Sequence, residues 1–497
     1  MLKLKSALIG IVSGVIFMSA ANAQTIEQVN DKFRQLNEYL PTSNVYRTAS
    51  GAPGHEYWQQ QADYKIDVTL DDANQTLTGS ATIKYYNNSP DSLKYIWMQM
   101  DQNRFDPETS MDQMSRTTPK SSTGMTMERF RKHVDEQVFD GGYKVTSLTG
   151  ADGTALASTT VGSMMRIDLP TPVAAGATME FSIDWWYNIP DARQGYEYFP
   201  RDGNRVYEIA QWYPRVTAYS DYEGWHNKEY QGSGEFTLEF GDYDVTITAP
   251  ADHIVASTGE LQNSAEVLTQ DQRDRLIEAR TASVPMFIVT PDEAVENEKS
   301  NADTTKTWHY KAENVRDFAF ASSRKFIWDA MGYRMKENGK TVMAMSYYPM
   351  AGQPLWSDIS TQAVMHTLQV YNKYSLTYPY PVALSINGPI GGMEYPMISF
   401  NGARPTIHDD GTRTYGRRTK HGLIGVIIHE VGHNYYPMII NSDERQWTWM
   451  DEGMNTFVQN LAHQEWKEDY PLGRIDPRNI TGYMTSTNQV PIMSNAE

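Results

Sequence analysis

The segment from His429 to Glu452 constrains the fold of this chain more than any other. His429 and His433 are four residues apart, so both imidazoles project from one face of a helix. Glu430 follows the first histidine and points about 100° away around the helix. Eighteen residues separate His433 from Glu452, which brings in a further carboxylate on the next helix. This pattern predicts a zinc site with His429, His433 and Glu452 as ligands and an open position for water.

The chemistry that this site predicts is metal-assisted hydrolysis. One zinc ion per chain, bound by two neutral imidazoles and a carboxylate, lowers the pKa of its water molecule. Glu430 is expected to act as general base toward that water, which attacks a carbonyl polarised by the metal. The alternative is a helix with two solvated or core histidines. Glu452 falls where a third ligand is needed, and this independent feature favours the metal site.

Composition restricts the partners of the chain. Its 497 residues exceed what one hydrophobic core serves, so two or three domains are expected. A formal net charge of −18 argues against nucleic acid and anionic membrane surfaces as main partners. The chain contains no cysteine, which excludes disulfides and thiolate zinc ligands.

The first residues have the pattern of an export signal. Lys3 and Lys5 precede an apolar run over 7–18, which is too short to span a membrane stably. Residues 21–23 supply the small side chains of a cleavage site, so cleavage is predicted after Ala23. The mature protein is expected to be secreted, most simply into a bacterial periplasm, without insertion into a membrane.

The hydrophobic pattern divides the mature chain into three parts. Residues 24–59 contain an amphipathic helix over 25–40 and a linker. Residues 60–295 alternate apolar and polar side chains, which predicts a β-rich domain of antiparallel strands. Residues 296–497 mix both periods. The strands expected in the β domain include 64–70, 77–85, 93–100, 166–169, 180–187, 235–240 and 243–248.

Within this division, two polar segments interrupt the regular elements. The segment 101–142 is expected to be a long insertion with a short helix near 127–134, and the acidic segment 291–305 suits a domain boundary. In the last part a strand is expected over 341–348. The helices expected there cover 315–330, 357–374, 422–435 and 451–466.

A glycine-rich loop supplies further candidate site residues. Gly391 and Gly392 precede Met393 and Glu394, and glycine allows the backbone to approach a substrate closely. Glu394 is either an ordinary turn residue or an anion placed to bind a positive group. The residues themselves leave both interpretations open.

These motifs together resemble the M1 family of zinc aminopeptidases, the gluzincin group that includes aminopeptidase N and leukotriene A4 hydrolase. The two histidines with Glu430 and Glu452 match its helix motif, and 391–394 match its exopeptidase loop, with Tyr395 in place of the usual asparagine. Similar segments cover most of residues 60 to 465. The resemblance implies an α+β fold, in which a saddle-like, antiparallel β-rich domain precedes a thermolysin-like, mainly helical catalytic domain.

The resemblance also implies roles for particular residues. Glu394 would bind the free α-amino group of a peptide substrate, and Gly391 and Gly392 would align the peptide backbone. Gln211 is the best match to a further amine-binding residue of the β domain. The family's oxyanion-stabilising tyrosine would lie beyond Glu497, so the catalytic domain is expected to be truncated.

The sequence therefore predicts an exported zinc aminopeptidase that acts on peptides with a free amino terminus. One alternative is a zinc endopeptidase or another hydrolase on the same scaffold. A different alternative is a non-catalytic peptide-binding protein that keeps zinc as a structural ion. Glu430 weighs against the last, because a structural site needs no base and usually has four protein ligands. No pattern in the sequence indicates an oligomeric state.

Overall fold

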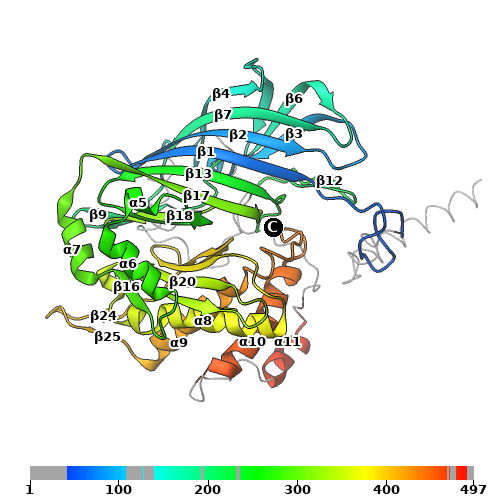
Figure 1. Ribbon diagram of the computed structural model, residues 1–497. Coiled ribbons are helices and arrows are strands. Elements are labelled where there is room, and N and C mark those ends of the chain that lie inside the picture. The colour runs from blue at the N-terminus through cyan, green and yellow to red at the C-terminus, as the bar shows by residue number, and fades with distance from the viewer. Residues whose placement is uncertain are drawn as a thin grey trace, which may run out of the picture.

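The computed structural model describes residues 42–107, 127, 139–191, 195–230, 235–466, 470, 477–487 and 489. The predicted export signal and the helix expected over 25–40 lie outside these residues, as does nearly all of 127–134. A layer rich in strands lies above a layer that holds the longest helices (Figure 1). We call these the β part, which comprises the described residues between 42 and 262 together with 305–323, and the α/β part, which comprises 264–300 and the described residues from 327 onward.

The largest sheet belongs to the β part and has the strand order β15-β17-β13-β1-β2-β7-β4. Alternate residues of β1 and β2 are buried, as the alternation in the sequence predicts. β1 pairs with β13 in parallel, so the sheet is mixed and not wholly antiparallel as expected. The long connection between these two strands permits the parallel pairing. The strands are β1 (Gln61–Asp71), β2 (Thr76–Tyr86), β4 (Lys144–Gly150), β7 (Thr178–Asn188), β13 (Gly241–Pro250), β15 (Glu260–Leu261) and β17 (Thr305–Val315).

Two four-stranded sheets, in the orders β10-β3-β6-β5 and β14-β18-β9-β8, and a short hairpin complete the β part. The strand expected over 235–240 is wrong, because Leu238 alone among these residues forms a bridge, to Thr217. The neighbouring Thr237 donates its hydroxyl to Asp443 of the α/β part instead. The strands are β3 (Leu93–Gln99), β5 (Ala157–Val161), β6 (Met164–Val173), β8 (Tyr196–Phe199), β9 (Asn204–Ile209), β10 (Arg215–Val216), β11 (Tyr219–Ser220), β12 (Gly224–Trp225), β14 (Ile254–Ser257) and β18 (Phe320–Ser323).

The α/β part is built on a six-stranded sheet in the order β16-β19-β20-β21-β23-β22. The strand expected over 341–348 is confirmed, whereas the helix expected over 315–330 is wrong, because this segment forms β18 and the start of β19. Both strands are almost wholly buried and lack the alternation that separates a strand from a helix in a sequence. The strands are β16 (Met286–Val289), β19 (Ile327–Arg334), β20 (Thr341–Tyr348), β21 (Val382–Asn387), β22 (Gly392–Tyr395) and β23 (Ile398–Asn401).

Helices cover this sheet. The helices expected over 357–374, 422–435 and 451–466 are confirmed as α8 (Leu355–Tyr374), α9 (Arg417–Gly432) and α10 (Met454–Trp466). α8 and α9 pack against each other, and each contacts the sheet. Smaller elements are α5 (Ser264–Val267), α6 (Gln270–Ala279), α7 (Pro291–Ser300), α11 (Thr481–Met484), the 3-10 turns η1 (Asp101–Phe105), η3 (Met350–Gly352) and η6 (Pro477–Ile480), and the hairpin of β24 (Thr406–Ile407) and β25 (Arg413–Thr414).

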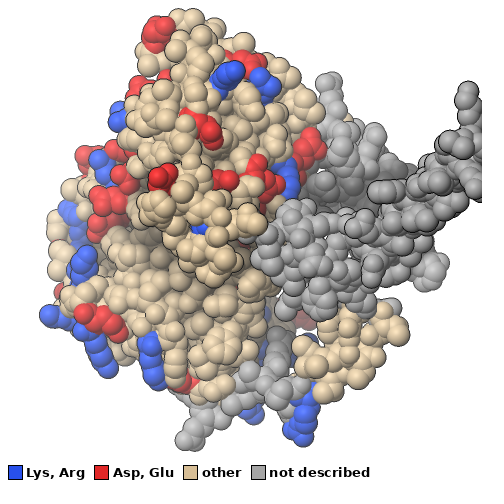
Figure 2. Space-filling view, turned by 90° about the vertical axis from the view of Figure 1, so that its right-hand side faces the viewer, with Lys and Arg blue, Asp and Glu red and all other residues tan. Residues whose placement is uncertain are grey.

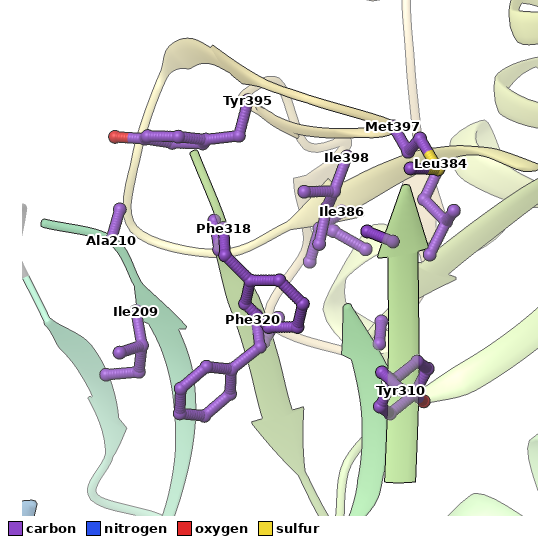
Figure 3. Packing of buried hydrophobic residues seen from close by; sticks show 14 of the residues in the cluster. Ile209, Ala210, Tyr310, Phe318, Phe320, Leu384, Ile386, Tyr395, Met397 and Ile398 are labelled. Atoms are coloured by element: carbon purple, nitrogen blue, oxygen red, sulfur yellow. The ribbon is translucent and has the colours of Figure 1, made fainter. Parts of the chain in front are cut away.

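A common apolar core joins the two parts. Figure 3 shows Ile209, Phe318 and Phe320 of the β part in one cluster with Ile386 and Ile398 of the six-stranded sheet. Each of these side chains is buried, and the burial of a large apolar side chain contributes roughly 1.5–3 kcal/mol. The core therefore holds the two parts in a fixed relation.

One face of the molecule carries charged side chains of both signs. Acidic and basic residues are interspersed on the face shown in Figure 2. Within the described residues, no helix has the length and apolar character needed to cross a membrane.

A buried chain of polar side chains crosses the α/β part. Asp329 of β19 accepts hydrogen bonds from Thr361 and Tyr348, and the hydroxyl oxygens of Thr361 and Ser346 lie 2.7 Å apart. From there Ser346 donates to Ser360 of α8 at 2.7 Å. Burial raises the pKa of Asp329 to about 7, although both hydrogen bonds oppose the shift. The carboxyl group of Asp329 therefore keeps its proton to a higher pH in the folded state than in the unfolded chain.

This raised pKa predicts a pH-dependent stability. Between about pH 4 and pH 7 the folded state keeps a proton that the unfolded chain releases, so this contribution is complete below about pH 4 and is lost as the pH rises to about 7. Asp329→Asn removes the titration, so its free energy of unfolding minus that of the parent should be roughly 2.5 kcal/mol larger at pH 8 than at pH 5.

Urea unfolding at both pH values measures this difference. Asp274→Asn, on the exposed face of α6, is the control and should show no such change. An identical pH dependence in Asp329→Asn and the parent would contradict the assignment.

Candidate metal centre

Three side chains from two helical elements converge on one point. His429 and His433 lie on and at the end of α9, and Glu452 lies in the π-turn Trp449–Gly453 that leads into α10. The two Nε2 atoms are 3.1 Å apart. The Glu452 Oε2 atom lies 3.3 Å from Nε2 of His429 and 3.9 Å from Nε2 of His433. The sequence-predicted ligands are therefore brought together.

The spacing of these atoms fits a zinc ion. Tetrahedral coordination with metal–ligand distances of about 2.0–2.1 Å places neighbouring ligand atoms about 3.3 Å apart. The three measured separations of 3.1, 3.3 and 3.9 Å bracket that value. Glu452 is 45% exposed, so the centre is open to solvent on the side of this ligand. Two imidazoles and one carboxylate form the donor set of a catalytic zinc site.

Hydrogen bonds on the far side of each ring orient the imidazoles. Nδ1 of His429 lies 3.1 Å from Oε1 of Gln459. Nδ1 of His433 lies 2.8 Å from the carbonyl oxygen of Tyr436 and 2.8 Å from Oδ1 of Asp451. These acceptors favour the tautomer with the proton on Nδ1, which leaves the Nε2 lone pairs directed at the common point.

The centre gathers several buried carboxyl groups. Glu394, Glu430 and Asp451 are 4%, 6% and 0% exposed. Burial raises the pKa of Glu430 and Glu394, while the neighbouring His433 acts in the opposite direction. The hydrogen bond with His429 lowers the pKa of Glu452. Apart from its contact with His433, the Asp451 carboxylate has no hydrogen-bond partner among the described residues. Buried carboxyl groups of this kind bind a proton or are compensated by a cation.

A second group of possible metal ligands already has hydrogen-bond partners within the protein. Glu223, His226 and Asp443 also bring their side-chain atoms within 4.8 Å of one another. Asp443 accepts hydrogen bonds from Thr237 and Tyr222, and Glu223 accepts one from Gln446 at 2.8 Å. Because its carboxylates are already hydrogen-bonded, this group is satisfied without a metal.

The glycine loop lies beside the metal centre. A Cβ atom built on Gly392 would lie 2.4 Å from Oε1 of Glu430, whereas one built on Gly391 would meet nothing within 4 Å. Oε1 of Glu394 lies 3.9 Å from Nδ1 of His433. Gly392, Glu394 and Glu430 are thus gathered around the histidines, and Gly391 faces open space.

Gln211 has a separate set of contacts. It has a positive φ of 47° and follows β9, and its amide nitrogen donates to the Tyr395 hydroxyl at 2.5 Å. The backbone carbonyl oxygen of Gln211 accepts hydrogen bonds from Gln102 at 3.0 Å and from Tyr143 at 2.9 Å. Among the described residues no hydrogen bond joins Gln211 to Glu394 or to the histidines. The structure therefore links Gln211 to the residue that follows Glu394 and not to the metal centre itself.

Sequence reasoning missed three residues around this centre. Asp451 directly precedes Glu452, and a carboxylate beside a predicted ligand is a local signal that could have identified it. Gln459 lies on α10 without a distinctive motif. Glu235 interacts electrostatically with Asp451 and His433, and burial raises its pKa to about 7. Because Glu235 is distant in sequence from the motif, no local pattern indicates its position.

Solved structures of M1 zinc metallopeptidases align with this chain. A variant of the M1 zinc metallopeptidase from Deinococcus radiodurans aligns with a TM-score of 0.51 and 13% identity, over 88% of this chain and 77% of that one. The unsubstituted enzyme aligns with a TM-score of 0.47 and 12% identity, over 82% and 70% of the two chains. No protein family and no curated protein matches the sequence. At this identity the likeness concerns the fold alone, which is the α+β fold of an M1 zinc metallopeptidase.

The contact between Asp451 and His433 predicts an effect on metal affinity. Asp451→Asn keeps the shape of the side chain but removes the negative charge that orients and polarises the imidazole. We expect zinc affinity to fall roughly 10- to 100-fold. Competition with a chromophoric chelator measures it, with the exposed Asp358→Asn as control. Equal affinities of Asp451→Asn and the parent would show that the Asp451 carboxylate does not support His433.

Proposed function

We propose that this chain is a zinc-dependent peptidase of the M1 family that removes residues from the amino end of peptides. The observation that carries the proposal is the convergence of His429, His433 and Glu452 on one point. Three protein ligands with one open position are typical of catalytic zinc sites, whereas structural sites use four. The M1-like fold supports the same family.

Glu430 is the proposed general base. Zinc, when bound, polarises the substrate carbonyl and lowers the pKa of a coordinated water molecule. The Glu430 carboxylate is next to His429 in sequence and lies against Gly392, where it faces the loop along which the peptide would run. From this position it takes the proton of the attacking water and returns it to the departing amine. Gly392 has no side chain that would displace the carboxylate.

The surplus of buried carboxylates supports a substrate with a free ammonium group. Side-chain atoms of Glu394, Asp451 and His433 lie within 4.8 Å of one another. A zinc ion would offset two negative charges, fewer than the carboxyl groups around it can carry. A protonated α-amino group supplies the missing positive charge and donates charge-assisted hydrogen bonds to the Glu394 carboxylate.

Gln211 is proposed as a further contact of the substrate amine. Its amide nitrogen is engaged by Tyr395, so its amide oxygen remains as the acceptor for an N–H group. Gly391, which faces open space, leaves the backbone of the loop accessible to the peptide. Both assignments place recognition at the amino end of the substrate.

A pair of matched substrates tests this function. The zinc-loaded chain should hydrolyse L-alanyl-p-nitroanilide and should act at least 100-fold more slowly on its N-acetylated form, because acetylation removes the ammonium charge. Glu430→Gln should lower kcat roughly 10²- to 10⁴-fold and keep its zinc. Equal hydrolysis of both substrates would remove Glu394 from amine binding and favour an endopeptidase. Unchanged turnover in Glu430→Gln would refute its role as base.

A further inference from the structure

One arginine of the β part meets the connection between the metal ligands. Arg316 follows β17 and is 2% exposed. Its Nη1 donates to Oδ1 of Asn441 at 2.9 Å and to the carbonyl oxygen of Pro437 at 3.4 Å. The same nitrogen forms an ion pair with Glu444, which is 1% exposed. All three acceptors belong to the segment 434–448, which links His433 to the turn that carries Glu452.

These contacts continue to the turn that carries the third ligand. The backbone oxygen of Glu444 accepts a hydrogen bond from the Thr448 hydroxyl at 3.2 Å, and Thr448 directly precedes the π-turn Trp449–Gly453. Arg445, beside Glu444, donates to the carbonyl oxygen of Lys228 at 2.6 Å. The segment is therefore fixed to the β part within a few residues of Asp451 and Glu452.

The positive charge of Arg316 also stabilises the ionised form of Glu444. Burial raises the pKa of Glu444, Arg316 opposes this shift, and the nearby carboxylates of Asp451 and Glu235 add to it. Arg316 provides the opposing positive charge. Loss of one partner of a buried ion pair leaves an uncompensated charge, which is much more disruptive than loss of an exposed pair. Without the guanidinium, the buried Glu444 side chain would lose its ion-pair partner.

We propose that Arg316 is a positioning residue for the metal centre: it holds the segment 434–448 so that Glu452 meets His429 and His433. The inference rests on the proposed function in that it takes His429, His433 and Glu452 as the zinc ligands. Arg316 does not touch the metal or the substrate. It makes metal affinity depend on the docking of the α/β part against the β part.

Zinc affinity, measured by chelator competition, tests the proposal without reference to turnover. Arg316→Ala should lower the affinity at least 10-fold. Arg316→Lys should lie between this variant and the parent, because an ammonium group lacks the fork of the guanidinium. The control is Arg324→Lys, which alters another buried arginine of the same region paired with Asp72 and Asp252, and it should leave the affinity unchanged.

A double-mutant cycle separates positioning from general destabilisation. If Arg316 acts through Glu452, then Arg316→Ala should cost little affinity when added to Glu452→Gln. If Arg316→Ala does not fold, as judged by circular dichroism, Asn441→Ala takes its place, because it removes one acceptor at a half-buried position and should still lower zinc affinity at least twofold.

Three results would overturn the proposal: parental affinity in the Arg316 variants, parental affinity in Asn441→Ala, or a loss that is fully additive with Glu452→Gln. A chain whose zinc affinity depends on Arg316 but which hydrolyses neither p-nitroanilide would support the proposal and contradict the proposed function alone. The two claims therefore fail in distinguishable ways.

Discussion

The burial of several carboxyl groups around two imidazoles is the constraint on which the rest of this structure depends. Glu394, Glu430 and Asp451 are all withdrawn from water within reach of His433, and Glu452 lies against His429. Isolated carboxylates in such surroundings are costly, and they persist where a cation or a proton compensates them. A divalent metal bound by the two histidines and Glu452 satisfies part of this requirement, and a substrate ammonium group satisfies more of it.

These groups lie on separate elements of the fold. The helix α9 carries the two histidines and Glu430, the edge strand β22 carries Gly392 and Glu394, and a π-turn presents Asp451 and Glu452. The connection between α9 and the π-turn is anchored on the β part by Arg316. Because the apolar core in Figure 3 fixes the two parts against each other, the third ligand is placed by residues far away in sequence.

The sequence predicted the groups that local geometry determines. Helical spacing brings His429 and His433 to one face whatever the surrounding fold, so the histidine pair and the helices that flank it could be predicted. Glu235 and Arg316 could not, because their roles arise from contacts between segments that the sequence does not place together. The segment 315–330 was mistaken for a helix because its strands are buried on both faces. Gln211 was found by resemblance, but its contact with Tyr395 depends on tertiary packing.

The measurement that tests the central claim most directly is the zinc content of the purified chain after exhaustive dialysis, compared with that of His433→Ala. The account predicts about one zinc ion per parent chain, as expected for a single three-ligand site, and little or none in a His433→Ala variant that retains the circular dichroism spectrum of the parent. A parent chain that binds no zinc, or a His433→Ala variant that binds as much as the parent, would contradict it.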